Sequence, residues 1–322
     1  MATIPAISIV TPTFNRREAL LRAVASVRAQ GFQHYEHIIV DDGSTDGTAD
    51  ELSMLQDSRL RYVALQKHVG ANAARNHGLH LASSNLLTFL DSDDEFLPGR
   101  LERSVSFFGE RPEIDLSISS FHICKDGRTM TPTVNQNALF DARTLERSVF
   151  AQVTSIAGTA ITVRRRAIEA VGLFDEGLWR LQDRDLLLRL AVAGYGAAIL
   201  DEIDWTKHYS ADSISRQRNG YIAAYGELMG RHPDLRQRYP EMVSYMVARR
   251  LLSSLLQGRI GDLVSDYRDN LRHDQLRLSG RALVCGYHRG RQQRGRIQSE
   301  IGDIARNGST ADRSRSPALL RS

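Results

Sequence analysis

Three short apolar runs in the first hundred residues each lead into a cluster of polar side chains. The runs lie at Ala6–Thr11, Glu36–Val40 and Leu86–Leu90, and short apolar runs of this kind are typical of buried strands. Segments with apolar residues at helical spacing lie between them, at Arg17–Gln30 and Ala71–Ala82. Strands that alternate with helices predict an α/β fold, with a mixed, mostly parallel sheet flanked by helices.

The polar clusters lie where sheets of this class bind their ligands. In a doubly wound sheet the ligand sits beyond the carboxyl ends of the parallel strands. The three runs lead into Thr11–Arg16, Asp41–Asp46 and Asp91–Asp94. Because Mg²⁺ and Mn²⁺ favour carboxylate oxygens and commonly bind together with substrate phosphates, these aspartates suit a divalent cation on a phosphate ligand. The alternative for any isolated Asp-x-Asp pair is that it caps a turn or a following helix.

Several other kinds of site are excluded. A calcium loop that starts at Asp42 would have its glycine at Gly47, but Ser53 stands at the twelfth position, where Glu is required. Neither common type of glycine-rich phosphate loop is present, so kinase, P-loop ATPase and dinucleotide-binding functions lose their main support. Cys124 and Cys285 have neither metal nor redox spacing and argue against a disulfide scaffold.

The pattern along the chain predicts three regions. Residues 1–215 contain the alternating strands and helices, and residues 216–285 form a helical extension. In the extension an apolar stripe runs from Met242 to Leu256, which predicts packing against the main domain, with a membrane interface as the alternative. Residues 286–322 are rich in Arg, Gln, Gly and Ser and predict a basic, flexible tail.

The charge of the C-terminal region bears on partners and localisation. Residues 281–322 contain nine Arg and three acidic residues, and the whole chain has a net charge of +4. Such a region can meet acidic lipids, nucleic acid or an acidic protein. Tyr287 is its only aromatic residue, so base-stacking platforms are absent and we expect no nucleic-acid partner. The first ten residues lack the basic start of a signal peptide and no apolar run could span a bilayer, so we expect a cytoplasmic protein, with peripheral contact to the inner membrane face.

Six sequence blocks together resemble glycosyltransferase family 2, and they occur in that family's order and at its spacing. The blocks are Ser8–Arg16, Ile39–Thr48, Ala73–Gly78, Phe89–Asp94, Val171–Glu176 and Gln182–Leu190. The resemblance covers roughly residues 5–215 and does not extend to the last hundred. It implies the GT-A fold, a Rossmann-like α/β domain, and transfer of a sugar from a nucleoside-diphosphate donor with inversion.

The resemblance also implies roles for residues of the donor site. Asp42 would meet the base of the nucleotide, and Arg75 would also serve the nucleotide. Asp91-Ser92-Asp93 matches the family's Asp-x-Asp element. Asp91 and Ser92 would contact the donor, and Asp91 and Asp93 would hold a Mn²⁺ or Mg²⁺ ion, with Asp93 as the more direct ligand. The nucleotide pocket would also be lined by Thr11, Pro12, Thr13 and Asn15.

Two residues further along the chain complete the implied site. Asp183 matches the family's general base. The residue before that base is usually Glu, and Gln182 in this chain alters the local charge while leaving the base in place. His208 falls where relatives often carry a histidine after the last strand, and it would complete the metal or diphosphate site. The alternative for His208 is a structural histidine.

These observations predict an inverting, metal-assisted glycosyltransferase of the hexosyl type. The donor would be a nucleotide-diphosphate sugar, a UDP-sugar first of all, and the acceptor a glycan or glycolipid in the assembly of a surface polysaccharide or glycolipid. A metal at Asp93 would stabilise charge on the departing diphosphate while Asp183 takes the proton of the acceptor hydroxyl. One alternative is a catalytically silent scaffold of the same fold that binds nucleotide or glycan, against which the intact aspartates argue. The other is a nucleotidyltransferase, which would need no base at Asp183.

Overall fold

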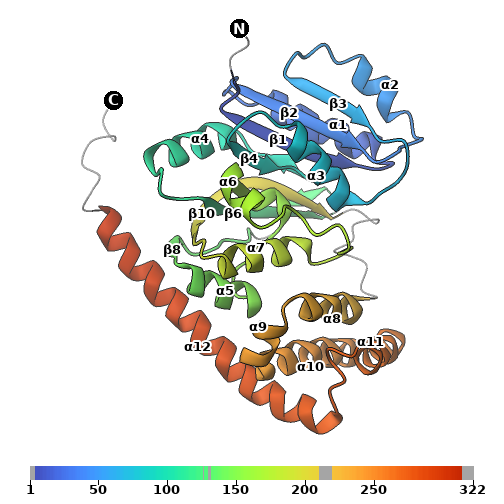
Figure 1. Cartoon of the computed structure of the whole chain (residues 1–322), viewed down its shortest axis with the longest axis vertical. Helices are drawn as coiled ribbons and strands as arrows, with labels where there is room; N and C mark the ends of the chain where they lie inside the picture. The colour runs from blue at the N-terminus through green and yellow to red at the C-terminus, as the bar shows by residue number, and fades with distance from the viewer. Residues whose placement is uncertain (1–3, 126, 130–131, 210–219, 314–322) are drawn as a thin grey trace.

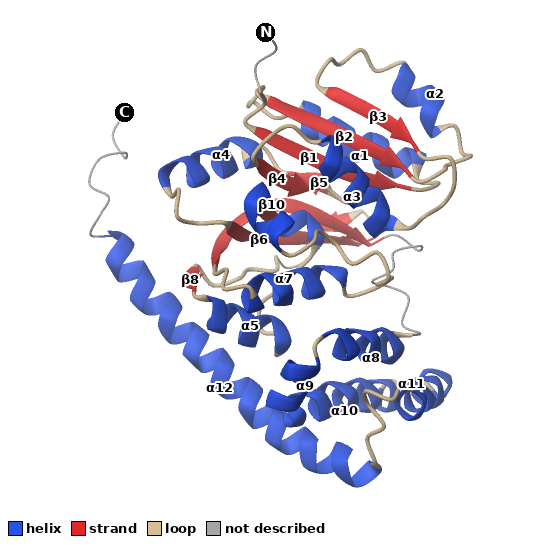
Figure 2. Ribbon diagram, viewed as in Figure 1, coloured by secondary structure: helices blue, strands red, loops and turns tan. Residues whose placement is uncertain are grey.

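Ten strands of the described chain join in one mixed sheet, drawn in red in Figure 2. The computed structural model describes residues 4–125, 127–129, 132–209 and 220–313. In chain order the strands are β1 (Ile7–Thr13), β2 (Tyr35–Asp41), β3 (Leu60–Ala64), β4 (Leu86–Phe89), β5 (Glu95–Phe96), β6 (Leu116–Lys125), β7 (Arg128–Thr129), β8 (Ala138–Phe140), β9 (Ile161–Arg164) and β10 (Ala197–Tyr209). They pair in the order β3-β2-β1-β4-β9-β6-β10-β5, with β7 beside β6 and β8 beside β10.

Helices cover both faces of the central strands, which are therefore apolar along most of their length. The helices are α1 (Arg17–Arg28), α2 (Thr48–Ser53), α3 (Ala71–Leu81), α4 (Arg100–Glu110), α5 (Ala142–Phe150), α6 (Arg165–Ala170), α7 (Gln182–Val192), α8 (Tyr221–Arg231), α9 (Pro233–Arg238), α10 (Pro240–Leu256), α11 (Ile260–Arg272) and α12 (Gly280–Arg313), with a short 3-10 helix, η1 (Gly158–Ala160), after α5. Figure 1 shows α3 in front of the sheet and α1 behind it. All seven residues of β1 are buried between these two layers.

The order of the strands reverses beside β1. β1 pairs in parallel with β2 on one side and with β4 on the other, whereas β4 pairs antiparallel with β9. The carboxyl ends of β1, β2 and β4 therefore meet at one edge, and such a reversal point leaves a crevice for a ligand. The predicted α/β fold, with a mixed, mostly parallel sheet flanked by helices, is confirmed.

Helices α8 to α12 follow the sheet, and α12 runs diagonally past α10 and α5 to β8 (Figure 1). Gly286 and Gly290 of α12 lie so close to α10 that a Cβ on either one would collide with Ser244 or Glu241. The large apolar side chains of α10 are buried as far as Leu251. The apolar stripe of α10 is therefore buried over most of its length, but it packs mainly against α12 and α11, whereas the sequence had predicted packing against the main domain.

The segment predicted as a flexible tail is helical as far as it is described. The predicted boundary at residue 286 falls inside α12. Ile297 and Ile301 are buried, and Arg294 donates hydrogen bonds of 3.1 and 3.0 Å to two backbone carbonyl groups that follow α5. A few apolar residues at helical spacing, together with one arginine, are enough to dock the helix. The prediction of a flexible tail was based on the low average apolar content of residues 286–322, and an average does not show how the few apolar residues are spaced.

Two further expectations concern the C-terminal half. The predicted boundary at residue 215 and the last part of the predicted tail, residues 314–322, lie outside the described residues. Within the described ranges, no helix is both long and apolar enough to cross a membrane. Exposed large apolar side chains are concentrated at the end of α10 and along α11, at Leu252, Leu255, Leu256, Ile260, Val264, Tyr267 and Leu271.

Candidate functional site

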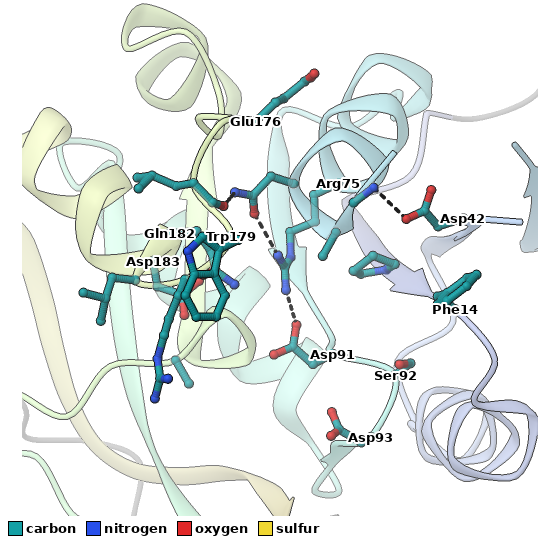
Figure 3. Close-up of a pocket in the computed structure, with 18 of the residues that line it drawn as sticks. Phe14, Asp42, Arg75, Asp91, Ser92, Asp93, Glu176, Trp179, Gln182 and Asp183 are labelled. Carbon is teal, nitrogen blue, oxygen red and sulfur yellow. Dashed lines mark hydrogen bonds and ion pairs between the residues drawn. The ribbon is translucent and has the colours of Figure 1, made fainter. Parts of the chain in front are cut away.

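A pocket of about 700 Å³ lies at the edge of the sheet where β1, β2 and β4 end (Figure 3). Its walls come from the loops after these strands, from α3, from the segment before η1 and from the start of α7. The pocket brings together most of the predicted site residues, namely Pro12, Thr13, Asp42, Arg75, Asp91, Ser92, Asp93 and Asp183. Thr11, Asn15 and His208 are not among the residues that line it.

Asp42 marks one end of the pocket and is held by three donors. Its carboxylate accepts hydrogen bonds from the backbone N–H groups of Val69 (2.7 Å) and Gly70 (2.8 Å). The same carboxylate lies 2.8 Å from Nδ1 of His68. The ring of His68 lies against Phe14, with ring centroids 4.2 Å apart. These contacts fix the loop after β3 on the end of β2 and place an aromatic pair at this end of the pocket.

Thr11 and Asn15 do not line the pocket, but each is the chain neighbour of a residue that does, the buried Thr11 of Pro12 and the exposed Asn15 of Phe14. The hydroxyl of Thr11 is 2.9 Å from Nε2 of the buried His37 on β2. The backbone N–H of Asn15 donates to the hydroxyl of Ser44 (2.8 Å), and its side-chain oxygen accepts from the N–H of Thr45 (2.8 Å). Both residues therefore join the end of β1 to β2 and its following loop.

Arg75, Asp91 and Asp183 converge in the middle of the pocket. Nη2 of Arg75 lies 2.6 Å from Oδ1 of Asp91. Gly158 faces all three side chains, because a Cβ at this glycine would lie 3.2 Å from Asp183 Oδ1, 3.7 Å from Asp91 Oδ1 and 3.9 Å from Arg75 Nη2. A glycine at position 158 therefore keeps open the space that these three charged groups share.

The two aspartates differ in how readily they ionise. Burial opposes the charge of Asp91, but Arg75, together with Lys207 and Arg16, outweighs it and holds the pKa of Asp91 below its usual value. Burial raises the pKa of Asp183, Arg75 offsets only part of that rise, and the charge of Asp91 adds to it. Oδ1 of Asp183 is inaccessible to solvent and has no hydrogen-bond partner among the described residues. A carboxylate of raised pKa on a pocket wall has the properties of a proton acceptor.

Asp93 and Asp94, which follow Asp91 in the chain, have different partners. Oδ2 of Asp93 pairs with Nη1 of Arg16 at 2.7 Å. Asp94 is buried and accepts a hydrogen bond of 2.7 Å from the hydroxyl of Thr159. Burial raises the pKa of Asp94 well above its usual value, and the charge of Lys207 lowers it by less. Asp91 and Asp93 are thus each paired with an arginine, whereas Asp94 is held by a hydroxyl.

This donor set fits a metal ion only in company with ligand phosphates. In the part of the chain that the structure describes, no three His, Cys, Asp or Glu side chains are grouped to hold a metal ion. Mg²⁺, however, commonly binds one or two carboxylates and fills its other positions with water and substrate phosphate oxygens. Asp93 and Asp91 would supply those carboxylates. Arg16 and Arg75, which pair with these two aspartates in the structure, would then bind the oxygens of a diphosphate.

The structure places Lys207, and not His208, at the pocket. Neighbouring residues of a strand point to opposite faces, and it is Lys207 of β10 that lines the pocket. Burial lowers the pKa of Lys207, but the charges of Asp94 and Asp91 raise it by more, so the ammonium group stays charged. Nε2 of His208 lies 2.9 Å from Oε1 of Glu95 on β5. His208 therefore contacts Glu95 and does not line the pocket, and the basic residue that the sequence prediction missed is its neighbour.

The end of the pocket beyond Asp183 is basic and aromatic, and sequence reasoning missed it as well. Trp179, Arg180 and Arg184 come from both sides of Asp183 in the chain, and Tyr221 comes from the start of α8. In Figure 3 Trp179 and Asp183 lie on the side of the pocket opposite Asp42 and Phe14. Two arginines within four residues of a predicted base were the available signal, but nothing in the sequence placed Tyr221 beside them.

Comparison with known proteins supports the same reading of fold and family. The family profile "Glycosyl transferase family 2" matches residues 8–172, just over half of the chain. The described part of the chain also has the fold of S. aureus TarS 1-349, solved in complex with UDP-GlcNAc, with a TM-score of 0.66 at 16% identity over 94% of this chain and 92% of that one. The predicted GT-A architecture with a helical C-terminal region is therefore confirmed.

Curated relatives match over different lengths. The "Putative colanic acid biosynthesis glycosyl transferase WcaA" of Escherichia coli (strain K12) is 27% identical over 274 residues, which is 81% of this chain and 97% of that protein. The "Putative teichuronic acid biosynthesis glycosyltransferase TuaG" of Bacillus subtilis (strain 168) is 42% identical over 109 residues, 33% of this chain and 43% of that protein. The second match thus spans less than half of its relative. On the strength of the profile match, and of the site that lies within and beside it, the chain belongs to glycosyltransferase family 2.

Proposed function

We propose that the protein is an inverting glycosyltransferase in which Asp183 is the general base. The observation that supports this most directly is the state of the Asp183 carboxylate. One of its oxygens is buried without a partner among the described residues, and burial raises its pKa. A general base works best when its pKa lies near the working pH and when it can reach the proton that it removes.

The donor is proposed to lie along the pocket, with its nucleoside toward Asp42 and its diphosphate over Asp91, Ser92 and Asp93. Arg16, Arg75 and Lys207 bring three positive charges to that middle section. Three cations beside the leaving group favour the charge that develops on it. A Mn²⁺ or Mg²⁺ ion bound at Asp93 would supply further Lewis-acid stabilisation of the diphosphate.

The proposed step is a single displacement at the anomeric carbon of the donor sugar. The bond from the acceptor oxygen to that carbon forms while the bond from the carbon to the diphosphate oxygen breaks. The proton of the acceptor hydroxyl passes to Asp183, and the nucleoside diphosphate departs with the bonding electron pair. One displacement from the face opposite the leaving group inverts the anomeric configuration.

The substrates are proposed by analogy with named relatives. The proposed donor is a UDP-sugar, because the TarS structure was solved with UDP-GlcNAc. The proposed acceptor is a glycan or glycolipid of a surface polysaccharide. Two relatives support this proposal, the teichuronic acid protein above and the "GalNAc(5)-diNAcBac-PP-undecaprenol beta-1,3-glucosyltransferase" of Campylobacter jejuni subsp. jejuni serotype O:2, which is 42% identical over 100 residues, 30% of this chain and 32% of that protein.

We also propose that the protein works in the cytoplasm against the inner face of the membrane. The exposed apolar side chains at the end of α10 and along α11 would make the contact, for example Leu255 and Leu256. Amphipathic surfaces with flanking arginines bind in the headgroup region of anionic membranes.

The test is turnover and binding of a panel of nucleotide sugars with Mn²⁺. Wild-type protein is compared with Asp93→Ala and Asp183→Asn. We expect one donor to be bound and slowly hydrolysed with added metal, with loss of that metal dependence in Asp93→Ala. Asp183→Asn should keep donor binding and lose transfer, whereas a nucleotidyltransferase would keep its activity in this variant. If folded wild-type protein binds no donor, the proposal is wrong and a silent scaffold takes its place.

A further inference from the structure

We propose that the end of the pocket beyond Asp183 is an acceptor subsite that binds a phosphate-bearing acceptor through Arg180 and Arg184. The inference rests on the proposed function, since that function defines where the acceptor hydroxyl must lie. It goes further by naming the chemical class of the acceptor and the residues that select it.

The position of the subsite follows from the geometry of the displacement. The acceptor oxygen attacks from the face opposite the diphosphate, and its proton must be within reach of Asp183. Asp91 and Asp93 lie between Asp42 and Asp183 in the pocket (Figure 3), so the acceptor has to approach from the side of Asp183 that is remote from Asp42. Arg180 and Arg184 line the pocket, Arg184 directly follows Asp183 in α7, and the guanidinium of Arg180 lies 6.0 Å from the ring of Trp179, which Figure 3 shows beside Asp183.

Aromatic rings hold the first of these arginines in place. The guanidinium carbon of Arg180 lies 5.4 Å from the ring centroid of Tyr221 and 6.0 Å from that of Trp179. Arg250 lies 5.9 Å from the same tyrosine ring. The hydroxyl of Tyr221 accepts a hydrogen bond of 2.7 Å from Gln152. A guanidinium held beside aromatic rings loses less entropy when it binds the two oxygens of a phosphate side by side.

The second arginine is fixed by the protein backbone. Nη1 of Arg184 donates a hydrogen bond of 2.9 Å to the carbonyl oxygen of Val149. Arg184 directly follows Asp183 in α7, so its guanidinium and the proposed base belong to the same helical turn. An anion bound there would be tied to the same element that places the base.

The electrostatics at this end of the pocket favour an anion. Burial lowers the pKa of Arg180 and that of Arg184, and the neighbouring Arg250 and Arg249 lower them further. Among the described residues, Asp183 acts on Arg184 and Asp266 acts on Arg180, and Asp266 lies 2.7 Å from Arg250. Arg180 and Arg184 are thus cations that burial disfavours and that have further arginines beside them, and a bound phosphate would offset their positive charge.

A platform for a sugar ring adjoins these arginines. Trp179 is 44% exposed and lines the pocket, yet its ring packs against Gly220, where an added Cβ would lie 3.0 Å from the indole. The indole is therefore held in place while one part of it stays open. An aromatic face next to two arginines fits a sugar that carries a phosphate or diphosphate, with the ring on Trp179 and the anion on the guanidinium groups.

The experiment compares three acceptor forms of each sugar in a monosaccharide panel, namely the decyl diphosphate, the lipid-free 1-phosphate and the neutral decyl glycoside. The variants are Arg180→Gln and, as a matched control, Arg61→Gln, which removes an exposed arginine on the edge strand β3. We expect Arg180→Gln to lower the ratio of kcat/KM for the diphosphate to kcat/KM for the neutral glycoside by at least about tenfold, mainly through KM. Arg61→Gln should leave this ratio as it is.

The acceptor forms separate the two sources of the phosphate. If both the 1-phosphate and the decyl diphosphate lose efficiency in Arg180→Gln, the subsite recognises a phosphate on any acceptor. If only the decyl diphosphate loses efficiency, the subsite recognises the diphosphate of a lipid carrier. The inference is overturned if Arg180→Gln still hydrolyses donor and the ratio of the two kcat/KM values is unchanged. This includes the case in which kcat/KM falls equally for the diphosphate and for the neutral glycoside.

A second measurement keeps the inference testable if the variant or the proposed function fails. Arg180→Lys keeps the charge without the planar fork and should fall between wild type and Arg180→Gln, so it replaces the glutamine variant if that one does not fold. If wild-type protein turns over no donor, the proposed function is wrong. In that case titration calorimetry with decyl diphosphate that carries no sugar tests whether the subsite binds a diphosphate. Binding weakened at least about tenfold in the variant supports the subsite, and equal binding overturns it.

Discussion

Arg75 and Asp91 form an ion pair of 2.6 Å that joins α3 to the loop after β4 in the middle of the pocket. The side chain of Arg75 is 4% exposed and that of Asp91 is 28% exposed. Nη1 of Arg75 also donates to the side-chain oxygen of Asn72 at 3.2 Å. The pair keeps Asp91 ionised and places a positive charge near Asp183, so it governs the charge of the whole middle section of the pocket.

Replacing Arg75 should destabilise the fold. In Arg75→Gln the Asp91 carboxylate stays partly buried but loses its main ion-pair partner. We therefore expect the free energy of unfolding to fall by about 2 kcal/mol. This is less than the loss of a partner in a fully buried pair, because Asp91 is partly exposed. Urea denaturation measures the change, with the exposed Arg61→Gln as the control. A loss no larger than that of the control would show that water replaces the arginine without cost.

Asp183→Asn should be more stable than the wild type and inactive in transfer. The folded-state pKa of Asp183 is raised, so its ionised form costs stability above that pKa, and a neutral amide removes the cost. Loss of a general base slows transfer by about 10²–10⁴-fold. Thermal unfolding and transfer assays on the same preparations test both effects. A variant that is inactive and also less stable would indicate that Asp183 supports the fold instead of the reaction.

The pH profile should show an acid limb above the range of an ordinary aspartate. The base must be ionised to accept a proton, and burial raises the pKa of Asp183. Transfer should therefore fall as the pH is lowered through that raised pKa, at a pH above the value of about 3.9 for an unperturbed Asp. The measurement is kcat/KM from pH 4 to 8 at saturating metal. A profile that is flat down to pH 4 would exclude Asp183 as the base.

His37 should make the fold sensitive to mild acid. Burial lowers the pKa of His37 to about 3, so between that value and about 6.5 the unfolded chain binds a proton that the folded chain does not. The free energy of unfolding should fall by about 1.4 kcal/mol for each pH unit below 6.5 from this residue alone. Urea denaturation at pH 7.5 and 5.5 should show a smaller pH effect in His37→Gln. The exposed His80→Gln should keep the wild-type slope, and the prediction fails if both variants behave alike.

Membrane binding should depend on the exposed end of α10. Leu255→Ser combined with Leu256→Ser should reduce flotation with anionic liposomes several-fold, because both side chains are exposed and apolar. Met54→Ser is the control, since Met54 is an exposed apolar residue outside this surface. Point substitutions are preferable to truncation near residue 280, which would remove α12 and expose the α10 residues that pack against it. Equal flotation of all three proteins would exclude this surface.

The sequence was sufficient for the features that depend on local geometry. An apolar run such as Ala6–Thr11 predicts a buried strand and the spacing in Arg17–Gln30 predicts a helix, because strand and helix periods are properties of the backbone itself. The strands β1, β2 and β4 and the helices between them appear where these patterns predicted them. The aspartates at the strand ends met in one pocket because parallel strands end at a common edge.

What the tertiary structure alone decided is which side chains face the pocket from distant parts of the chain. On β10 the register with β6 shifts twice before Trp205, so the pairing, and not the sequence alternation, determines that Lys207 faces the site and His208 faces Glu95. Contacts between segments far apart in sequence likewise placed Tyr221 against Arg180 and docked α12 on α10. Local periodicity specifies the faces of one element, whereas the partner of each face is settled only when the elements pack together.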